Sequence, residues 1–169
     1  EDAKARGVVI SYDSRHFSTE FALETALTLC ANGIKAYLFE SLRPVPEISF
    51  AIRHLKCIAG IAITASHNPA KYNGYKAYWE DGGQLPPKSS DYVISQIAKK
   101  DIFDDVKVMD ESEAKQKGLI EIIGKEIDEE YLKNVYMQSV TTEAIEKLGN
   151  DFSVIYSPFH GTGNKLVRA

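Results

Sequence analysis

Three short apolar runs in the first 64 residues constrain the fold of this chain more than any other feature. Residues 8–12, 34–39 and 59–64 are rich in Val, Ile, Ala and Phe, which is typical of strands buried on both faces of a parallel sheet. Between them, apolar residues recur at helical spacing in 19–32 and 46–55. Strands that alternate with helices predict βαβ units with right-handed crossovers, and therefore an α/β fold.

The rest of the chain repeats this pattern less regularly. The first helix is expected to be capped by Ser18, and Gly33 to end it. The further expected elements are a strand at 75–79, a helix from Ser89 or Ser90 with an apolar face toward the core, a strand near 119–123, a helix capped by Asp128, a weak helix at 141–150, a strand at 152–156 and a helix after Gly163. We therefore expect residues 1–140 to form a three-layer domain with a mixed, mainly parallel sheet between helices. Residues 141–169 would be a linker and the start of a second, similar domain.

Composition limits the partners of the chain. Among 169 residues, 20 Lys and Arg stand against 24 Asp and Glu, a formal net charge of −4. This balance provides no bulk field for nucleic acid or for an anionic membrane, so a bound anion must be held by local groups. The chain also has no run of 18 apolar residues and no apolar secretion signal near Glu1. Cys30 and Cys57 lie in apolar stretches without metal-type spacing, which favours buried reduced thiols and a cytoplasmic protein.

Three loops are candidates for the functional site because ligands of open α/β sheets bind beyond the carboxyl ends of the strands. They are residues 13–18, 64–76 and 157–164. The middle loop is the richest, since Ser66, His67 and Asn68 place a hydroxyl, an imidazole and an amide side by side, and an Asn-Gly turn precedes Lys76. This composition suits an anion or a phosphoryl group.

Other interpretations of these loops are weaker. Ser, Asn, Pro and Gly are common in any turn, so the middle loop need not be functional. A hydrolase with Ser66 as nucleophile and His67 as base is disfavoured, because adjacent side chains diverge and the G-x-S-x-G elbow is absent. The third loop lacks a dinucleotide fingerprint, since Leu166 stands where glycine is needed. His160 there either approaches the site across a domain junction or stabilises its own turn.

The middle loop carries a family resemblance. Its Thr-Ala-Ser-His-Asn-Pro at 64–69, followed by Tyr-Asn-Gly-Tyr-Lys at 72–76, resembles the phosphoserine loop of the α-D-phosphohexomutases, the phosphoglucomutases and phosphomannomutases. The similarity extends to Asp-x-Arg at 13–15, Pro-x-Pro at 44–46, Gly-Gly-Gln-Leu-Pro-Pro at 82–87 and Ser-Pro-Phe-His-Gly-Thr-Gly at 157–163. It therefore spans the whole chain.

The resemblance implies an isomerase that moves a phosphoryl group between carbons 1 and 6 of a hexose phosphate. The group would pass through a phosphoserine and a bisphosphorylated sugar, which also serves as activator. One Mg²⁺ per site would bind the phosphate on Ser66, with its remaining ligands outside this chain. The implied residue roles are Ser66 and Lys76 as catalytic residues, Arg15 and His67 as phosphate-binding residues, and Asp13, Asn68 and Gly74 as loop supports.

Departures from the family pattern indicate a piece of a larger protein. Members resemble a four-domain arrangement, but this sequence has no Asp-Gly-Asp-x-Asp metal loop and no opening Gly-Thr-Ala-Gly segment. We therefore expect most of domain I and a truncated start of domain II, inactive alone, whose partners are the hexose phosphate and the missing domains of the same parent chain. Two alternatives stay open. Residues 78–83 also resemble pentose-acting relatives, and the loop would suit a non-catalytic anion-binding module.

Overall fold

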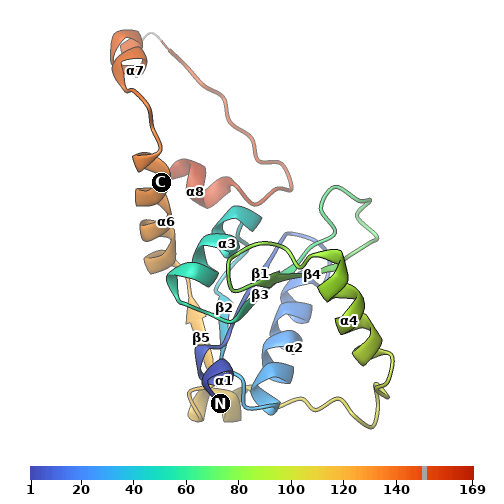
Figure 1. Ribbon diagram of the computed structural model, residues 1–169. Coiled ribbons are helices and arrows are strands. Elements are labelled where there is room, and N and C mark those ends of the chain that lie inside the picture. The colour runs from blue at the N-terminus through green and yellow to red at the C-terminus, as the bar shows by residue number, and fades with distance from the viewer. Residues whose placement is uncertain (150–151) are drawn as a thin grey trace.

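A five-stranded sheet forms the centre of the computed structural model, which describes residues 1–149 and 152–169 (Figure 1). The strand order is β4-β3-β1-β2-β5. The strands are β1 (Val8–Tyr12), β2 (Ala36–Phe39), β3 (Ala59–Ile63), β4 (Tyr75–Trp79) and β5 (Ile120–Ile123). β1 pairs parallel with β2 and β3, β2 pairs parallel with β5, and β4 pairs antiparallel with β3. The prediction of a mixed, mainly parallel sheet is confirmed.

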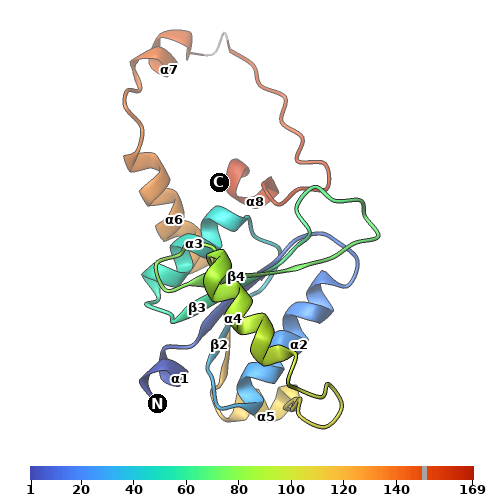
Figure 2. The same ribbon diagram turned by 45° about the vertical axis from the view of Figure 1, so that its right-hand side comes forward.

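Helices cover both faces of this sheet. The helices of the described chain are α1 (Asp2–Arg6), α2 (Ser18–Ala31), α3 (Val45–His54), α4 (Pro87–Ile97), α5 (Glu111–Gln116), α6 (Lys125–Met137), α7 (Glu143–Leu148) and α8 (Asn164–Arg168), of which α1, α4, α7 and α8 have no buried residue. α2 and α5 pack on one face, and α3 and α6 pack on the other (Figure 2). The predicted three-layer architecture is therefore present.

Alternation along β1 explains how one strand supplies two cores. Val8 and Ile10 point to the α2 side, while Val9 joins the α3 side, and all five residues of β1 are buried. Burial of both faces is why this run reads as continuously apolar. Cys30 and Cys57 lie one in each core as free, fully buried thiols, as predicted. Burial raises the pKa of Cys57 to about 12, so this thiol packs as a small apolar group.

Both capping predictions are wrong. Phe17, in a left-handed conformation, precedes α2, and Ser18 is the first helical residue, whose hydroxyl donates to Asp13 instead. Helix α6 begins three residues before Asp128, and the Asp128 carboxylate accepts from Arg43. In both cases another side chain replaces the helix N–H group as the partner: Asp13 of the preceding loop for Ser18, and Arg43, 85 residues away, for Asp128.

Helix α4 forms, but the prediction that its apolar residues face the core is wrong. No residue of α4 is buried, and Tyr92 and Ile97 are 67% and 61% exposed. The chain enters α4 from the edge strand β4, and by then α2 and α3 already cover the sheet (Figure 2). The helical spacing therefore predicted the element but not its neighbour.

The last segment of the chain differs most from expectation. Residues 152–156 form no strand, and Ile155 is fully exposed, because no described strand lies beside them to pair with. The weak helix is present as α7, although Asn150, the last residue predicted for it, lies outside the described residues. α8 follows Gly163 as predicted. No helix in the described part of the chain is both long and apolar enough to cross a membrane.

Candidate functional site

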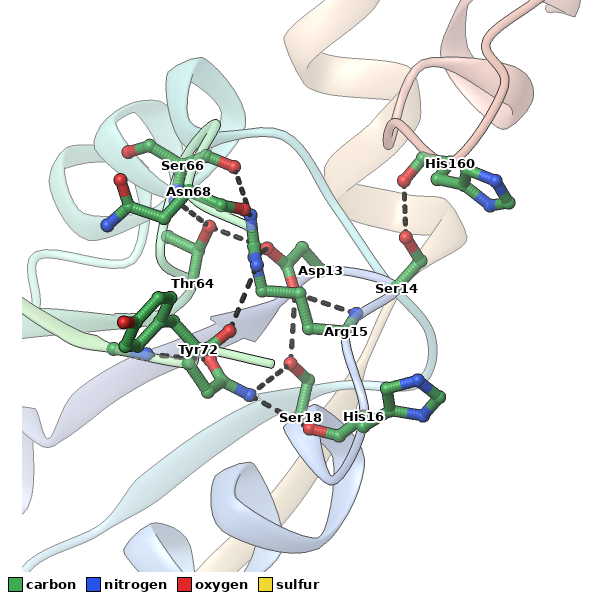
Figure 3. Close-up of polar contacts among 12 residues, drawn as sticks. Asp13, Ser14, Arg15, His16, Ser18, Thr64, Ser66, Asn68, Tyr72 and His160 are labelled. Carbon is green, nitrogen blue, oxygen red and sulfur yellow. Dashed lines mark hydrogen bonds and ion pairs between the residues drawn. The ribbon is translucent and has the colours of Figure 1, made fainter. Parts of the chain in front are cut away.

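The three candidate loops meet at the carboxyl edge of the sheet. Two adjoining clefts of about 180 and about 580 Å³ lie there, and each is lined by residues of all three loops. Asp13, Ser66, His160 and Gly161 line both clefts. The return of residues 157–163 to this edge is fixed in part by Ser14, whose hydroxyl donates to the carbonyl oxygen of His160 (Figure 3). The position of the first two loops follows from the parallel direction of β1 and β3, whereas residues 157–164 reach this edge without a preceding strand among the described residues.

Ser66 and Lys76 are brought into direct contact. Residues 64–76, called the serine loop below, leave β3 and return as β4, where Lys76 pairs with Ala62. This reversal places the Lys76 ammonium group beside the Ser66 side chain, and Nζ donates a hydrogen bond to Ser66 Oγ. Ser66 is exposed at the clefts and has a φ of 55°, in the left-handed region that serine rarely adopts. The geometry joins an accessible hydroxyl to a cation.

Arg15 binds the backbone of the serine loop through its guanidinium group. Its Nη1 donates to the carbonyl oxygens of Pro69 and Tyr72, at 3.1 and 2.9 Å. Its Nη2 donates to those of Ser66 and Asn68, both at 2.7 Å (Figure 3). These four bonds use all four terminal N–H groups of the guanidinium. In this conformation Arg15 is therefore a loop-holding residue, and it would bind a phosphate only after releasing a carbonyl group.

Asp13 is the acceptor that anchors Arg15 and both adjoining segments. Its Oδ1 accepts from the Ser18 hydroxyl at 2.9 Å and from the Arg15 amide at 3.0 Å. Its Oδ2 accepts from the Thr64 hydroxyl at 2.6 Å and lies 3.3 Å from Arg15 Nε. These are the contacts of a loop support.

The remaining expected site residues have simpler surroundings. His67 is exposed on the loop, and the Ser66 hydroxyl bonds Lys76 rather than this imidazole, so the serine–histidine hydrolase has no geometric support in the described chain. Asn68 contributes backbone groups, donating its amide to Ala65 as well as accepting from Arg15. Gly74 has no positive φ. It is required for space, because a Cβ there would lie 2.6 Å from the Thr64 carbonyl oxygen.

Sequence reasoning missed three polar residues of the site: Thr64, Ser18 and Asn73. Thr64 belonged to the recognised motif without a role, Ser18 was assigned to a helix cap, and Asn73 was read only as a turn residue. Asn73 donates to the Ser18 hydroxyl, and the hydroxyls of Ser18 and Thr64 both donate to Asp13. Their positions next to other polar loop residues were the only available signal.

The residues present do not fit a metal site by themselves. In the described ranges, no three His, Cys, Asp or Glu side chains gather to hold an ion. Asp13, the carboxylate nearest Ser66 in the clefts, already accepts three hydrogen bonds.

Fold and site together define a three-layer α/β domain with an exposed serine at the carboxyl edge of its sheet. The family model described as "Phosphoglucomutase/phosphomannomutase, alpha/beta/alpha domain I" matches residues 1–103. The chain belongs to this family.

Curated relatives and solved structures agree with the family. The phosphoglucomutase of Staphylococcus epidermidis RP62A is 39% identical over 160 residues, which are 95% of this chain and 28% of that protein. The phosphoglucomutase of Staphylococcus aureus MRSA252 is 36% identical over the same shares. The open form of parafusin, a phosphoglucomutase from Paramecium, superimposes with a TM-score of 0.76 at 20% identity, over 99% of this chain and 34% of its own. The chain thus spans less than a third of the length of these curated relatives.

Proposed function

We propose that this chain is the serine-bearing first part of a phosphosugar mutase, in which Ser66 carries the phosphoryl group between C1 and C6 of a hexose phosphate. One observation carries the proposal: the exposed Ser66 hydroxyl, which lines two adjoining clefts, accepts a hydrogen bond from the Lys76 ammonium group. Family membership supports the reaction class, and the curated relatives bear the name phosphoglucomutase.

The two side chains suit both directions of such a transfer. When a sugar hydroxyl attacks phosphoserine, a new sugar O–P bond forms and the P–Oγ bond of Ser66 breaks. The sugar hydroxyl loses a proton and Oγ gains one. Lys76 is the group in contact with Oγ, so it can give that proton and stabilise the charge on the departing oxygen, and the amine so formed can take up the proton that the sugar hydroxyl loses. After the bisphosphorylated sugar reorients, its other phosphoryl group returns to Oγ by the reverse exchange.

The domain division belongs to the same proposal. Both hydrophobic cores are built from residues between Val8 and Ile127, which supports a first domain ending near residue 140. The segment from 141 onward is held to it through Ser14 with His160, and through Lys165 with Glu40 at 2.5 Å. The rest of the parent protein would supply the metal ligands and the groups that select glucose, mannose or pentose. Mg²⁺ and a sugar bisphosphate are the cofactor and activator that this proposal includes.

The test uses the full-length parent protein and its Ser66→Ala variant. We expect Ser66→Ala to abolish conversion of glucose 1-phosphate to glucose 6-phosphate, and a phosphopeptide containing Ser66 to be found in the wild-type protein only. Ser95→Ala, a change of an exposed serine on α4, is the matched control and should leave activity unchanged. Turnover by Ser66→Ala would refute the carrier role, and turnover by the 169-residue chain alone would refute its dependence on the other domains.

A further inference from the structure

A continuous line of hydrogen bonds runs below Ser66 and joins residues 13–18 to the serine loop. Asn73 Nδ2 donates to Ser18 Oγ at 2.9 Å, and Ser18 Oγ donates to Asp13 Oδ1 at 2.9 Å. From the other side, the Ser66 amide donates to Thr64 Oγ1 at 3.0 Å, and Thr64 Oγ1 donates to Asp13 Oδ2 at 2.6 Å (Figure 3). The line therefore ends on the backbone of the serine itself.

The carboxylate of Asp13 fixes the direction of every bond in this line. An ionised carboxylate only accepts, so the hydroxyl protons of Ser18 and Thr64 both point at Asp13. This leaves the lone pairs of Thr64 Oγ1 free to accept from the Ser66 amide. The two hydroxyl-bearing residues are buried, with 1% of Ser18 and 9% of Thr64 exposed. Water therefore competes little with these bonds, and a lost partner would leave a buried polar group unsatisfied.

The Ser66 amide needs such a partner because its backbone conformation is strained. A left-handed conformation of a residue other than glycine is unfavourable and persists only where the surroundings impose it. At Ser66 the amide is bonded to Thr64 and the carbonyl to Arg15, so both sides of the residue are held. This conformation directs Oγ toward Lys76.

We propose that Thr64 is a positioning residue, which transmits the anchor of Asp13 to the Ser66 backbone and so keeps Oγ on Lys76. The inference rests on the proposed function, because it concerns the geometry of the same serine. The role belongs to the Thr64 hydroxyl, which donates to Asp13 and accepts from the Ser66 amide; a methyl group at the same place could do neither.

The test compares Thr64→Val with Thr64→Ser in the full-length protein. Valine keeps the shape but can neither donate to Asp13 nor accept from the Ser66 amide, whereas serine keeps both bonds. We expect Thr64→Val to lower kcat about 10- to 100-fold with KM changed less than about twofold, since displacement by about 1 Å can cost 100-fold in rate. Thr64→Ser should stay within about threefold of wild type. The rate at which Ser66 gains phosphate from glucose 1,6-bisphosphate in a single turnover should fall in parallel with kcat.

The outcomes separate this inference from the proposed function. If Thr64→Val phosphorylates Ser66 as fast as wild type, or if Thr64→Ser is as slow as Thr64→Val, the positioning role is wrong. If wild type turns over without ever carrying phosphate on Ser66, the proposed function itself is wrong. Should Thr64→Val fail to fold in a urea titration, Asp13→Asn provides the second variant. Its amide removes one acceptor from the line, and unchanged phosphorylation kinetics in it would equally overturn the inference.

Discussion

Two arginines follow neighbouring strands of the sheet and form networks of opposite kinds. Arg15, after β1, donates its four terminal N–H groups to backbone carbonyls of the serine loop. Arg43, after β2, is fully buried in its side chain, and its Nε and Nη2 bond carboxylates: both donate to Asp128, at 2.6 and 2.9 Å, and Nη2 also donates to Glu40 at 3.3 Å. Its Nη1 donates to the neutral oxygens of Ser41 and Leu42. The first network fixes the shape of a loop, and the second neutralises charge in the interior.

Each network leaves a buried polar group unsatisfied. In the first it is Arg15 Nε, which has no hydrogen-bond partner among the described residues although it lies 3.3 Å from Asp13 Oδ2. Around Arg43, the buried carboxyl group of Glu47 lies 3.7 Å from Nε, and neither of its oxygens has a hydrogen-bond partner in the described chain. Burial, together with the neighbouring Asp128 carboxylate, raises the pKa of Glu47 to about 8. For Asp128, desolvation opposes ionisation, but hydrogen bonds from Arg43 prevail and lower its pKa. We infer that Arg43 serves the stability of the fold and Arg15 the geometry of the site.

The largest expected effect is the loss of the Arg43 charge. Arg43→Met leaves the Asp128 carboxylate without its cation, and breaking a buried ion pair by removing one partner costs about 3–5 kcal/mol. Urea titration followed by circular dichroism measures this loss. Arg15→Met is the matched variant and should lose clearly less stability, because four of its partners are neutral carbonyl groups and its one carboxylate, Asp13, keeps three other hydrogen-bond donors. Equal losses would remove the distinction between the two networks.

The next effect concerns pH. The pKa of Glu47 is raised to about 8 from an ordinary value of 4.5. Between pH 4.5 and pH 8 the folded protein therefore keeps a proton on Glu47 that the unfolded chain has lost. Its contribution is complete below pH 4.5 and is lost as the pH rises toward 8, with a slope of at most about 1.4 kcal/mol per pH unit for one proton. Glu47→Gln should flatten this part of the stability profile, measured by urea titration from pH 5 to 8. Glu129→Gln, at an exposed position of α6, should not. An unchanged profile in Glu47→Gln would show that this carboxyl is ionised in the fold.

Arg15→Lys tests whether the serine loop needs the four N–H donors of the guanidinium group. A lysine keeps the charge but has three N–H donors on one atom and cannot span four carbonyl groups. We expect stability to change by less than about 1 kcal/mol, while kcat of the full-length protein falls about 10- to 100-fold through displacement of Ser66. Arg53→Lys on the surface of α3 serves as the control. Full activity in Arg15→Lys would mean that positive charge, and not the fork of donors, is what the loop requires.

The smallest effect is expected at the edge of the Arg43 network. Glu40 also accepts from Lys165 of α8 at 2.5 Å, and both side chains are about half exposed. An exposed ion pair contributes about 0–1 kcal/mol. A double-mutant cycle of Glu40→Gln and Lys165→Met should therefore give a coupling energy below about 1 kcal/mol. A larger coupling would place the contact with α8 among the buried, fold-determining interactions of Arg43.

Local sequence patterns were sufficient to predict the elements that pack directly in the two hydrophobic cores. The strands β1, β2 and β3 and the helices α2 and α3 were predicted because a strand buried on both faces is apolar throughout, and a helix packed on a sheet repeats its apolar residues every three to four positions. α4 shows the limit of this reasoning, since its apolar spacing is real but the sheet has no free face for it. The strand expected at 152–156 fails for a related reason, because a strand needs a neighbour that its own sequence does not encode.

The sequence by itself determined the alternation of strands and helices, the location of the polar loops after the strands and the serine motif with its lysine, because each depends on residues close together in the chain. Tertiary structure decided the partners. Arg15 bonds carbonyl groups more than 50 residues away, and Asn73 donates to Ser18, 55 residues away. Such contacts depend on how two distant loops cross at one edge of the sheet, and that distance is set only when the strands between them have paired.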